Sequence, residues 1–289
     1  MKSLRLPLLL LVPILLFAGA CSDNGGGGED PDSNPLLPLP EGEAPDIVLL
    51  SVSGHGGAVS AIFCESDENR AYLMDGGEAT EALLSAFDNL GLDVLDAHFS
   101  DRVFADESGL ADRLGFAEMV GFLKAVQAKW ITGQAQPTRV VIVAHSHGAT
   151  WAHLAVALLD EIPIEYLITL DGICLQWECE HTAGLAEWLA ANGFAPPTDL
   201  TRPCELWTIG DVEYDTKDVA FDNVSINLEV HSNGFPVGDC CTNVRLDGTT
   251  DGIKTFMAPE SHSGVTLADS VSMAWVVDEI VARETVTAD

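Results

Sequence analysis

The sequence predicts an α/β fold with a mostly parallel central sheet, helices on both faces and a small lid-like insertion. Short runs rich in Val, Ile and Leu alternate along the chain with longer segments of helical spacing, as in parallel sheets covered by helices. Small or polar residues directly follow several of these runs, where ligands bind in such sheets. Residues 45–289 are numerous enough to form one large domain with a sizeable core.

The predicted elements alternate between strand and helix from residue 46 to residue 170, and further strands then precede a final helix. Strands are expected over 46–52, 92–97, 139–143, 165–170 and 204–210, with less clear ones over 225–230 and 243–246. Helices are expected over 80–90, 110–130, 150–159 and 267–283.

The N-terminus has the pattern of an export signal, and residues 1–20 are predicted to be a signal peptide. Its apolar run over 6–17 is shorter than the about 20 residues that a membrane-spanning helix needs. The small residues before Cys21 resemble a bacterial lipobox, in which the cysteine becomes the lipidated first residue. The resemblance implies a lipid anchor in the bacterial cell envelope, and Ser22 resembles a sorting signal for the outer membrane.

The composition of the rest of the chain indicates a tether and an acidic domain. Residues 21–44 contain four consecutive glycines and several prolines, and we interpret them as a flexible tether without chemistry of its own. The chain has 45 acidic and 13 basic residues, a formal net charge of −32. Such a surface repels nucleic acid, which excludes nucleic-acid binding as a function.

The most informative motif is the pentapeptide over 144–148, Ala-His-Ser-His-Gly. It lies between a predicted strand and a predicted helix, which is the context of a nucleophile elbow. Ala144 and Gly148 are small, as a sharp turn requires, although alanine replaces the first glycine of the usual pattern. Ser146 is therefore the candidate nucleophile, and a buried serine in an ordinary turn is the alternative interpretation.

The preferred base among the eight histidines is His262. It lies in a loop before the final helix, in the chain order Ser, acid, His. His231 is the rival base. The two histidines that flank Ser146 are expected to point away from it, and His153 is expected to pack within the following helix.

Two aspartates that end predicted strands, Asp171 and Asp211, are candidates for the acid that orients the base. Asp171 follows the strand next after the one that leads to Ser146, and Asp211 ends the strand after that. Glu213 and Asp215 are further alternatives near Asp211. Each aspartate could instead be a turn residue, since Asp-Gly and Gly-Asp pairs are common in turns.

These motifs resemble those of α/β-hydrolases of the lipase/esterase type, over roughly residues 45–285. The motifs are Gly54-His55-Gly56-Gly57, the pentapeptide around Ser146, Thr169-Leu170-Asp171 and Ser261-His262-Ser263. The resemblance implies the α/β-hydrolase fold and favours Asp171 over Asp211 as the acid.

The resemblance also implies a mechanism. Ser146 would attack an ester carbonyl while His262 takes its proton, and the backbone N–H groups of His147 and Gly57 would hold the oxyanion. Neither a metal nor another cofactor is needed. The expected substrate is a small-molecule or lipid ester, and the membrane is contacted through the N-terminal anchor. The alternatives are an amidase or peptidase with the same triad, and a non-catalytic binding lipoprotein that keeps the fold.

Six cysteines besides Cys21 form an even set, which suggests disulfides in an exported chain. They are Cys64, Cys174, Cys179, Cys204, Cys240 and Cys241. Cys174 and Cys179 could close a short loop, and a zinc site is disfavoured because no paired C-x-x-C spacing occurs.

The segment 172–203 is expected to be an insertion, either a lid over an acyl pocket or a packed peripheral helix. The segment 247–252 is expected to form turns rather than a calcium loop.

Overall fold

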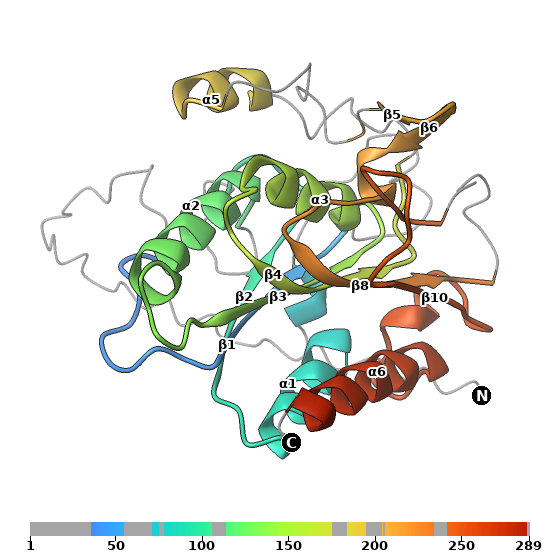
Figure 1. The fold of residues 1–289 in the computed structure, drawn as a ribbon, viewed down its shortest axis with the longest axis horizontal. Helices are drawn as coiled ribbons and strands as arrows, with labels where there is room; N and C mark the ends of the chain where they lie inside the picture. Colours follow the sequence, from blue (N-terminus) through green and yellow to red (C-terminus); the bar gives the residue numbers. More distant parts are fainter. Residues whose placement is uncertain are drawn as a thin grey trace, which may run out of the picture. The chain divides into compact units, whose positions relative to one another are not determined.

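A six-stranded sheet forms the centre of the computed structural model (Figure 1). Its strands are β1 (Ile47–Val52), β2 (Val94–Phe99), β3 (Arg139–His145), β4 (Ile164–Leu170), β8 (Val224–His231) and β10 (Ile253–Met257). They lie in the order β10-β8-β4-β3-β1-β2, and each neighbouring pair is parallel. The carboxyl ends of all these strands therefore meet at one edge.

The structure describes residues 36–54, 71–74, 78–105, 114–174, 184–194, 204, 206–233 and 242–287. They all belong to one compact unit, Asn34–Asp289. The predicted signal peptide, Cys21 and most of the tether lie outside the described residues. Within the described ranges, no helix is both long and apolar enough to cross a membrane.

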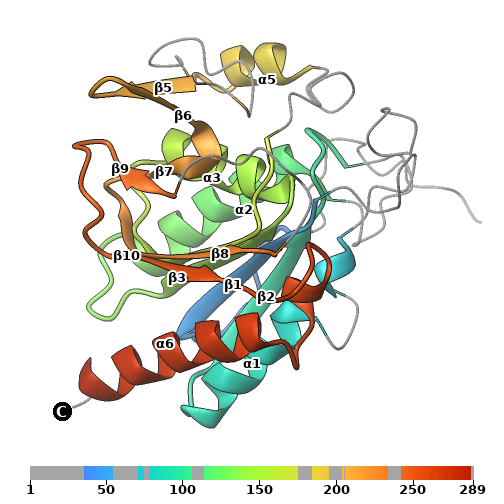
Figure 2. The same ribbon diagram turned by 90° about the vertical axis from the view of Figure 1, so that its right-hand side faces the viewer.

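Helices cover both faces of the sheet (Figures 1 and 2). One layer contains α2 (Phe116–Val126), which continues into a π-helical turn, and α3 (Gly148–Leu158); the other contains α1 (Ala79–Asn89) and α6 (Val271–Thr287). Side chains of a strand alternate between faces, so β1 contributes Val48, Leu50 and Val52 to one core and Ile47 and Leu49 to the other. The predicted α/β architecture is therefore confirmed.

Two small sheets lie on the α3 side of the central sheet (Figure 2). They are the antiparallel hairpin of β5 (Leu206–Ile209) and β6 (Val212–Asp215), and the short pair of β7 (Val219–Ala220) and β9 (Val244–Arg245). The prediction that 204–210 supplies the next strand of the central sheet is wrong, because β8 lies beside β4. Leu206 is 53% exposed, whereas an inner strand is covered on both faces.

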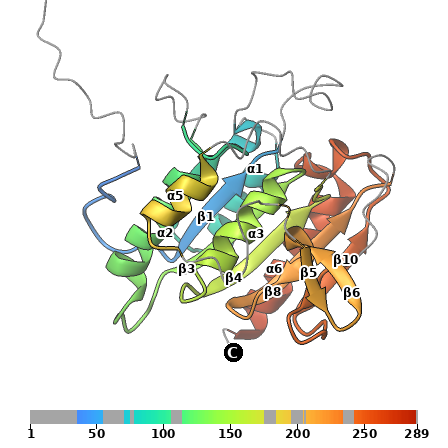
Figure 3. The same ribbon diagram turned by 90° about the horizontal axis from the view of Figure 1, so that it is seen from above.

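The described part of the insertion forms a short helix, α5 (Leu185–Ala191), which lies near α2 in Figures 1 and 3. Leu185 and Leu189 are buried in the core shared with α2 and α3. The ring of Trp188 packs edge-on against Phe116 of α2, with 5.6 Å between the centroids. These are the contacts of a packed peripheral helix; 175–183 and 195–203 lie outside the described residues.

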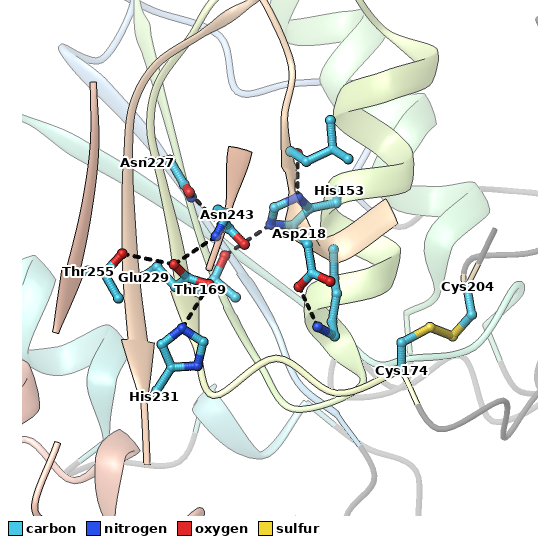
Figure 4. Close-up of polar contacts among 12 residues, drawn as sticks. His153, Thr169, Cys174, Cys204, Asp218, Asn227, Glu229, His231, Asn243 and Thr255 are labelled. Atoms are coloured by element: carbon cyan, nitrogen blue, oxygen red, sulfur yellow. Dashed lines mark hydrogen bonds and ion pairs between the residues drawn. A yellow bond between two sulfur atoms is a disulfide. The ribbon is translucent and has the colours of Figure 1, made fainter. Parts of the chain in front are cut away.

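A disulfide joins Cys174 to Cys204, so the predicted short loop between Cys174 and Cys179 is wrong (Figure 4). The insertion begins after β4 of the central sheet and ends before β5 of the separate hairpin. Its two ends lie together, with 5.7 Å between the Cα atoms of the bonded cysteines. The remaining cysteines lie outside the described residues.

In the segment 247–252, Asp247 Oδ1 accepts a hydrogen bond from the Thr249 N–H at 2.9 Å, as in the expected turn.

Candidate active site

Ser146 lies at the sharp turn between β3 and α3. Its φ of +57° is in the left-handed region, which is uncommon for a residue with a Cβ atom. Its N–H donates to the Leu170 carbonyl at 3.1 Å, and its carbonyl accepts hydrogen bonds from Ala149 and Ile173, both at 3.1 Å. Contacts from β4 and from the loop after it thus hold the serine in a strained conformation, a feature that is concentrated at functional sites.

Two glycines allow the end of β1 to pass close to this turn. A Cβ atom on Gly148 would lie 2.5 Å from the Val52 carbonyl oxygen. A Cβ atom on Gly54 would lie 2.6 Å from Cβ of Ser146 and 2.8 Å from the backbone nitrogen of His147. The predicted oxyanion loop therefore begins against the serine turn, while its later residues, including Gly57, lie outside the described residues.

The side chains of Ser146, His262 and Asp171 form a hydrogen-bonded chain. His262 Nε2 lies 2.9 Å from Ser146 Oγ, and His262 Nδ1 lies 2.5 Å from Asp171 Oδ2. Asp171 directly follows β4, and His262 lies in the loop between β10 and α6. The structure thus brings together the serine, acid and histidine that the sequence analysis favoured. The carboxylate accepts a hydrogen bond from the Nδ1–H group, which leaves Nε2 as the acceptor for the serine hydroxyl.

The Asp171 carboxyl group is held on both oxygens. Oδ2 faces His262, and Oδ1 accepts the N–H of Ser232 at 2.8 Å. Burial raises the pKa of this carboxyl group, but the hydrogen bonds from His262 and Ser232 outweigh that effect and keep the pKa below its ordinary value. The group is therefore ionised at neutral pH, as an acid that stabilises an imidazolium must be.

The alternative acids lie elsewhere. Asp211 is exposed in the turn between β5 and β6, and Glu213 and Asp215 belong to β6. This hairpin is a separate two-stranded sheet, so Asp211 does not end a strand of the central sheet.

The rival base His231 pairs with a buried carboxylate of its own strand. Its Nε2 lies 3.0 Å from Glu229 Oε1 (Figure 4). Glu229 Oε2 also accepts hydrogen bonds from the Asn243 N–H and the Thr255 hydroxyl, both at 3.0 Å. These contacts join β8 to β10 and to the segment before β9.

His153 of α3 is packed, as expected. Its side chain is completely buried, with Nδ1 2.9 Å from the Val219 carbonyl oxygen and Nε2 3.0 Å from Thr169 Oγ1 (Figure 4). Burial lowers the pKa of His153 to about 4. The histidine is therefore neutral at physiological pH.

The two histidines beside Ser146 have different surroundings. His147 is buried, and its Nδ1 lies 3.1 Å from Asp101 Oδ2. Its backbone nitrogen stands at the N-terminus of α3. His145 instead contacts the base, since its Nε2 lies 2.9 Å from the His262 carbonyl oxygen. This contact was not predicted from the sequence.

A second Ser–His–Asp chain occurs between β1 and β2. Ser51 Oγ lies 2.7 Å from His98 Nδ1, and His98 Nε2 lies 2.8 Å from Asp96 Oδ2. Ser51 is completely buried inside a regular strand, whereas the Asp96 side chain is 39% exposed. The hydrogen bonds alone therefore do not distinguish a nucleophile, but the strained turn of Ser146 does.

In the part of the chain that the structure describes, no group of three or more His, Cys, Asp or Glu side chains could hold a metal ion.

The chain shows only limited similarity to known proteins. No protein-family model matches the chain, and no curated protein matches it. Among solved structures, the chain is similar to Est1E from Butyrivibrio proteoclasticus, with 13% identity, coverage of 83% of this chain and 88% of that chain, and a TM-score of 0.37. A structure of ferulic acid bound to Est1E gives 14% identity, the same coverage and a TM-score of 0.38.

The arrangement of the strands and the site is nevertheless that of the predicted α/β-hydrolase fold. Ser146 follows β3 in a strand–turn–helix, Asp171 follows β4 and His262 follows β10, all at the carboxyl edge of a parallel sheet.

Proposed function

We propose that the protein is a serine hydrolase that cleaves carboxylic esters through a covalent acyl-enzyme. The observation that carries the proposal is the chain from Ser146 Oγ through the His262 imidazole to Asp171, with the serine in a strained turn. A serine hydroxyl is a weak nucleophile at neutral pH, and a hydrogen-bonded imidazole oriented by a carboxylate is the arrangement that activates it.

In the first half of the proposed reaction, Ser146 Oγ attacks the ester carbonyl carbon and its proton moves to His262 Nε2. The ionised Asp171 stabilises the imidazolium without taking the proton. The carbonyl electron pair moves onto oxygen, where we propose that the backbone N–H groups of His147 and Gly57 hold the charge. Donors of this kind supply a large share of the rate in such sites.

In the second half, the oxyanion collapses, the bond to the alcohol oxygen breaks, and His262 Nε2 returns its proton to that oxygen. The acyl group then remains on Ser146 Oγ. Water attacks the acyl carbon while His262 Nε2 takes its proton. The second oxyanion then collapses, the bond to Ser146 Oγ breaks, and His262 Nε2 returns the proton to that oxygen as the carboxylic acid leaves. The reaction uses this chain's own residues and needs no metal or cofactor.

The test is hydrolysis of p-nitrophenyl esters of short and long acyl chains by the wild type, Ser146→Ala and Ser51→Ala. We expect Ser146→Ala to lose activity, since removal of a triad member costs on the order of 10⁴-fold or more in kcat. Ser51→Ala removes a buried serine that is also hydrogen-bonded to a histidine, and it should retain activity. Equal rates for Ser146→Ala and the wild type would contradict Ser146 as the nucleophile, and a wild type no faster than the uncatalysed reaction would leave a non-catalytic binding protein.

The same enzyme preparations, tested on p-nitroanilides, distinguish an esterase from an amidase or peptidase. Hydrolysis of the anilide at a rate comparable to that of the matching ester would assign the site to amides. A preference for long over short acyl chains would assign it to lipids.

We also propose, on the sequence alone, that Cys21 is lipidated and anchors the protein to the bacterial cell envelope. Metabolic labelling of the expressing cells with a palmitate analogue tests this proposal. The label should appear on the wild type and not on Cys21→Ser; an unlabelled wild type would contradict it.

A further inference from the structure

We propose that His145 is a positioning residue, which holds the main chain of the base His262 as part of a hydrogen-bonded relay from Gly54 through Tyr72. The inference rests on the proposed function, because it explains how the base keeps its place beside Ser146.

The contact between His145 and His262 joins the nucleophile turn to the base. His145 is the last residue of β3, directly before Ser146, and it is 4% exposed. Its Nε2 lies 2.9 Å from the His262 carbonyl oxygen, and the two rings pack with 4.5 Å between centroids. Since a carbonyl oxygen only accepts, Nε2 of His145 carries the proton and donates it.

The other nitrogen of His145 extends the relay to β1. Its Nδ1 is hydrogen-bonded to the Tyr72 hydroxyl, and that hydroxyl oxygen accepts the Gly54 N–H at 3.0 Å. Because Nε2 holds the proton of a neutral ring, Nδ1 must accept and Tyr72 must donate. The relay therefore has one direction, from the Gly54 N–H through Tyr72 and His145 to the His262 carbonyl. It connects the start of the predicted oxyanion loop with the base.

The protonation states of His145 and Tyr72 keep the direction of this relay fixed. Burial, together with the smaller effect of a positive charge on His262, lowers the pKa of His145 to about 3. Burial raises the pKa of Tyr72, so its hydroxyl keeps the proton that it donates. A neutral His145 also adds no positive charge beside His262 when that ring becomes an imidazolium during the reaction.

The rest of the His262 loop is anchored at a neighbouring residue. Glu260 accepts hydrogen bonds from the Val271 N–H at 2.6 Å and the Ser272 hydroxyl at 3.0 Å, which ties the loop to the first turn of α6. The Glu260 carbonyl accepts the Asn233 N–H at 2.7 Å. These contacts place the loop, while the hydrogen bond from His145 acts on residue 262 itself, where a small displacement alters the distance to Ser146.

The experiment compares Tyr72→Phe, His145→Leu and His145→Gln with the control Tyr166→Phe. Tyr166→Phe also removes a hydroxyl from a buried residue, one that bonds to Glu284 away from the site. We would measure kcat and KM on a p-nitrophenyl ester, the rate constant of inactivation by a fluorophosphonate, and the free energy of unfolding. The proton on His262 Nδ1 would be followed by its low-field NMR resonance and its exchange with water.

We expect Tyr72→Phe and His145→Leu to lower kcat and the inactivation rate constant about 10- to 100-fold, with KM unchanged, as for a misplaced catalytic group. His145→Gln keeps an N–H that can reach the His262 carbonyl and should recover much of the loss. The His262 Nδ1 proton should exchange faster in the first two variants. Tyr166→Phe should change none of these quantities beyond its effect on unfolding.

The inference is overturned if Tyr72→Phe and His145→Leu lose no more rate than Tyr166→Phe, or if Gln at position 145 is no better than Leu. Failure of the proposed function is a different result, in which the wild type neither hydrolyses esters nor reacts with the fluorophosphonate. In that case proton exchange at His262 still decides the positioning role: unchanged exchange in both relay variants refutes it, and faster exchange supports it.

Discussion

Replacing Asp171 by Asn tests the proposed mechanism most directly, because the structure fixes how the new side chain would sit. The backbone at Asp171 has a φ of +47°, which Asn tolerates better than most residues. The Ser232 N–H donates to Oδ1, so it keeps the amide oxygen of Asn in that place. The amide NH₂ then faces His262 Nδ1, where in the wild type a carboxylate oxygen accepts a hydrogen bond from Nδ1–H.

An NH₂ group in this place favours the wrong form of the imidazole. His262 would accept at Nδ1 and carry its proton on Nε2, which then cannot take the proton of Ser146. In the Ser-His-Asp template this change costs about 10⁴-fold in kcat, or ~5.5 kcal/mol of transition-state stabilisation at 1.36 kcal/mol per tenfold. We expect a loss of this order for Asp171→Asn, with KM little changed.

The assay is ester hydrolysis by the wild type, Asp171→Asn and Asp211→Asn, together with the free energy of unfolding of each. Asp211 is exposed in a hairpin turn, so its Asn variant should retain both activity and stability. If Asp171→Asn keeps its rate within tenfold of the wild type, or if only Asp211→Asn loses turnover, the assignment of the acid is refuted.

Two further predictions concern stability. Gly148→Ala places a Cβ atom 2.5 Å from the Val52 carbonyl oxygen and should lose ester hydrolysis and several kcal/mol of unfolding free energy, ~3 or more, in chemical denaturation. Gly133→Ala, at a φ of +74° with open space around it, should cost only about 1 kcal/mol, and equal losses would contradict the packing argument. His153 has a folded pKa lowered to about 4 from an ordinary value of 6.5, so the unfolded chain binds the proton first and stability falls as pH drops below 6.5. His153→Gln should remove up to ~3 kcal/mol of this fall between pH 6.5 and 4, and an unchanged slope of unfolding free energy against pH would argue against it.

The part of the site that could be predicted from the sequence depended on local signals. Ser146 was found because a buried strand, small residues and a helix surround it. His262 was indicated by its place before the last helix. Asp171 and Asp211 were both indicated by their places after predicted strands, and the resemblance to lipases and esterases favoured Asp171. Such signals can be recognised in the sequence because they determine the backbone geometry of a few neighbouring residues.

The strands that were wrongly assigned or not predicted depend on tertiary packing, which the local sequence does not show. Asp211 and Asp171 both follow an apolar run, and sequence does not show that one run joins the central sheet and the other a hairpin. The strand β10 was not predicted, since it is short and carries Lys254 and Thr255 on an edge. β8 lies over one of the less clear predicted strands; Asn227 and Glu229 interrupt its apolar pattern, and both are buried in the polar network of Figure 4.

The contact of His145 with the base was available from strand alternation. Val141 and Val143 point toward the layer of α1 and α6, so His145, two residues later, points to the same side. The loop that carries His262 leads into α6 on that side. Periodicity within β3 thus indicated the neighbourhood of this histidine, but not its hydrogen bond.

The chain of Ser51, His98 and Asp96 has a consequence for the design of new hydrolases. A design procedure that scores only the hydrogen-bond distances among a serine, a histidine and an aspartate would accept this constellation, because its two hydrogen bonds are as short as those in many active sites. It would nevertheless produce an inert protein, since a substrate cannot reach a serine sealed inside a sheet. The backbone around the serine, and the free space in front of its oxygen, must therefore be specified before the imidazole and the carboxylate are added.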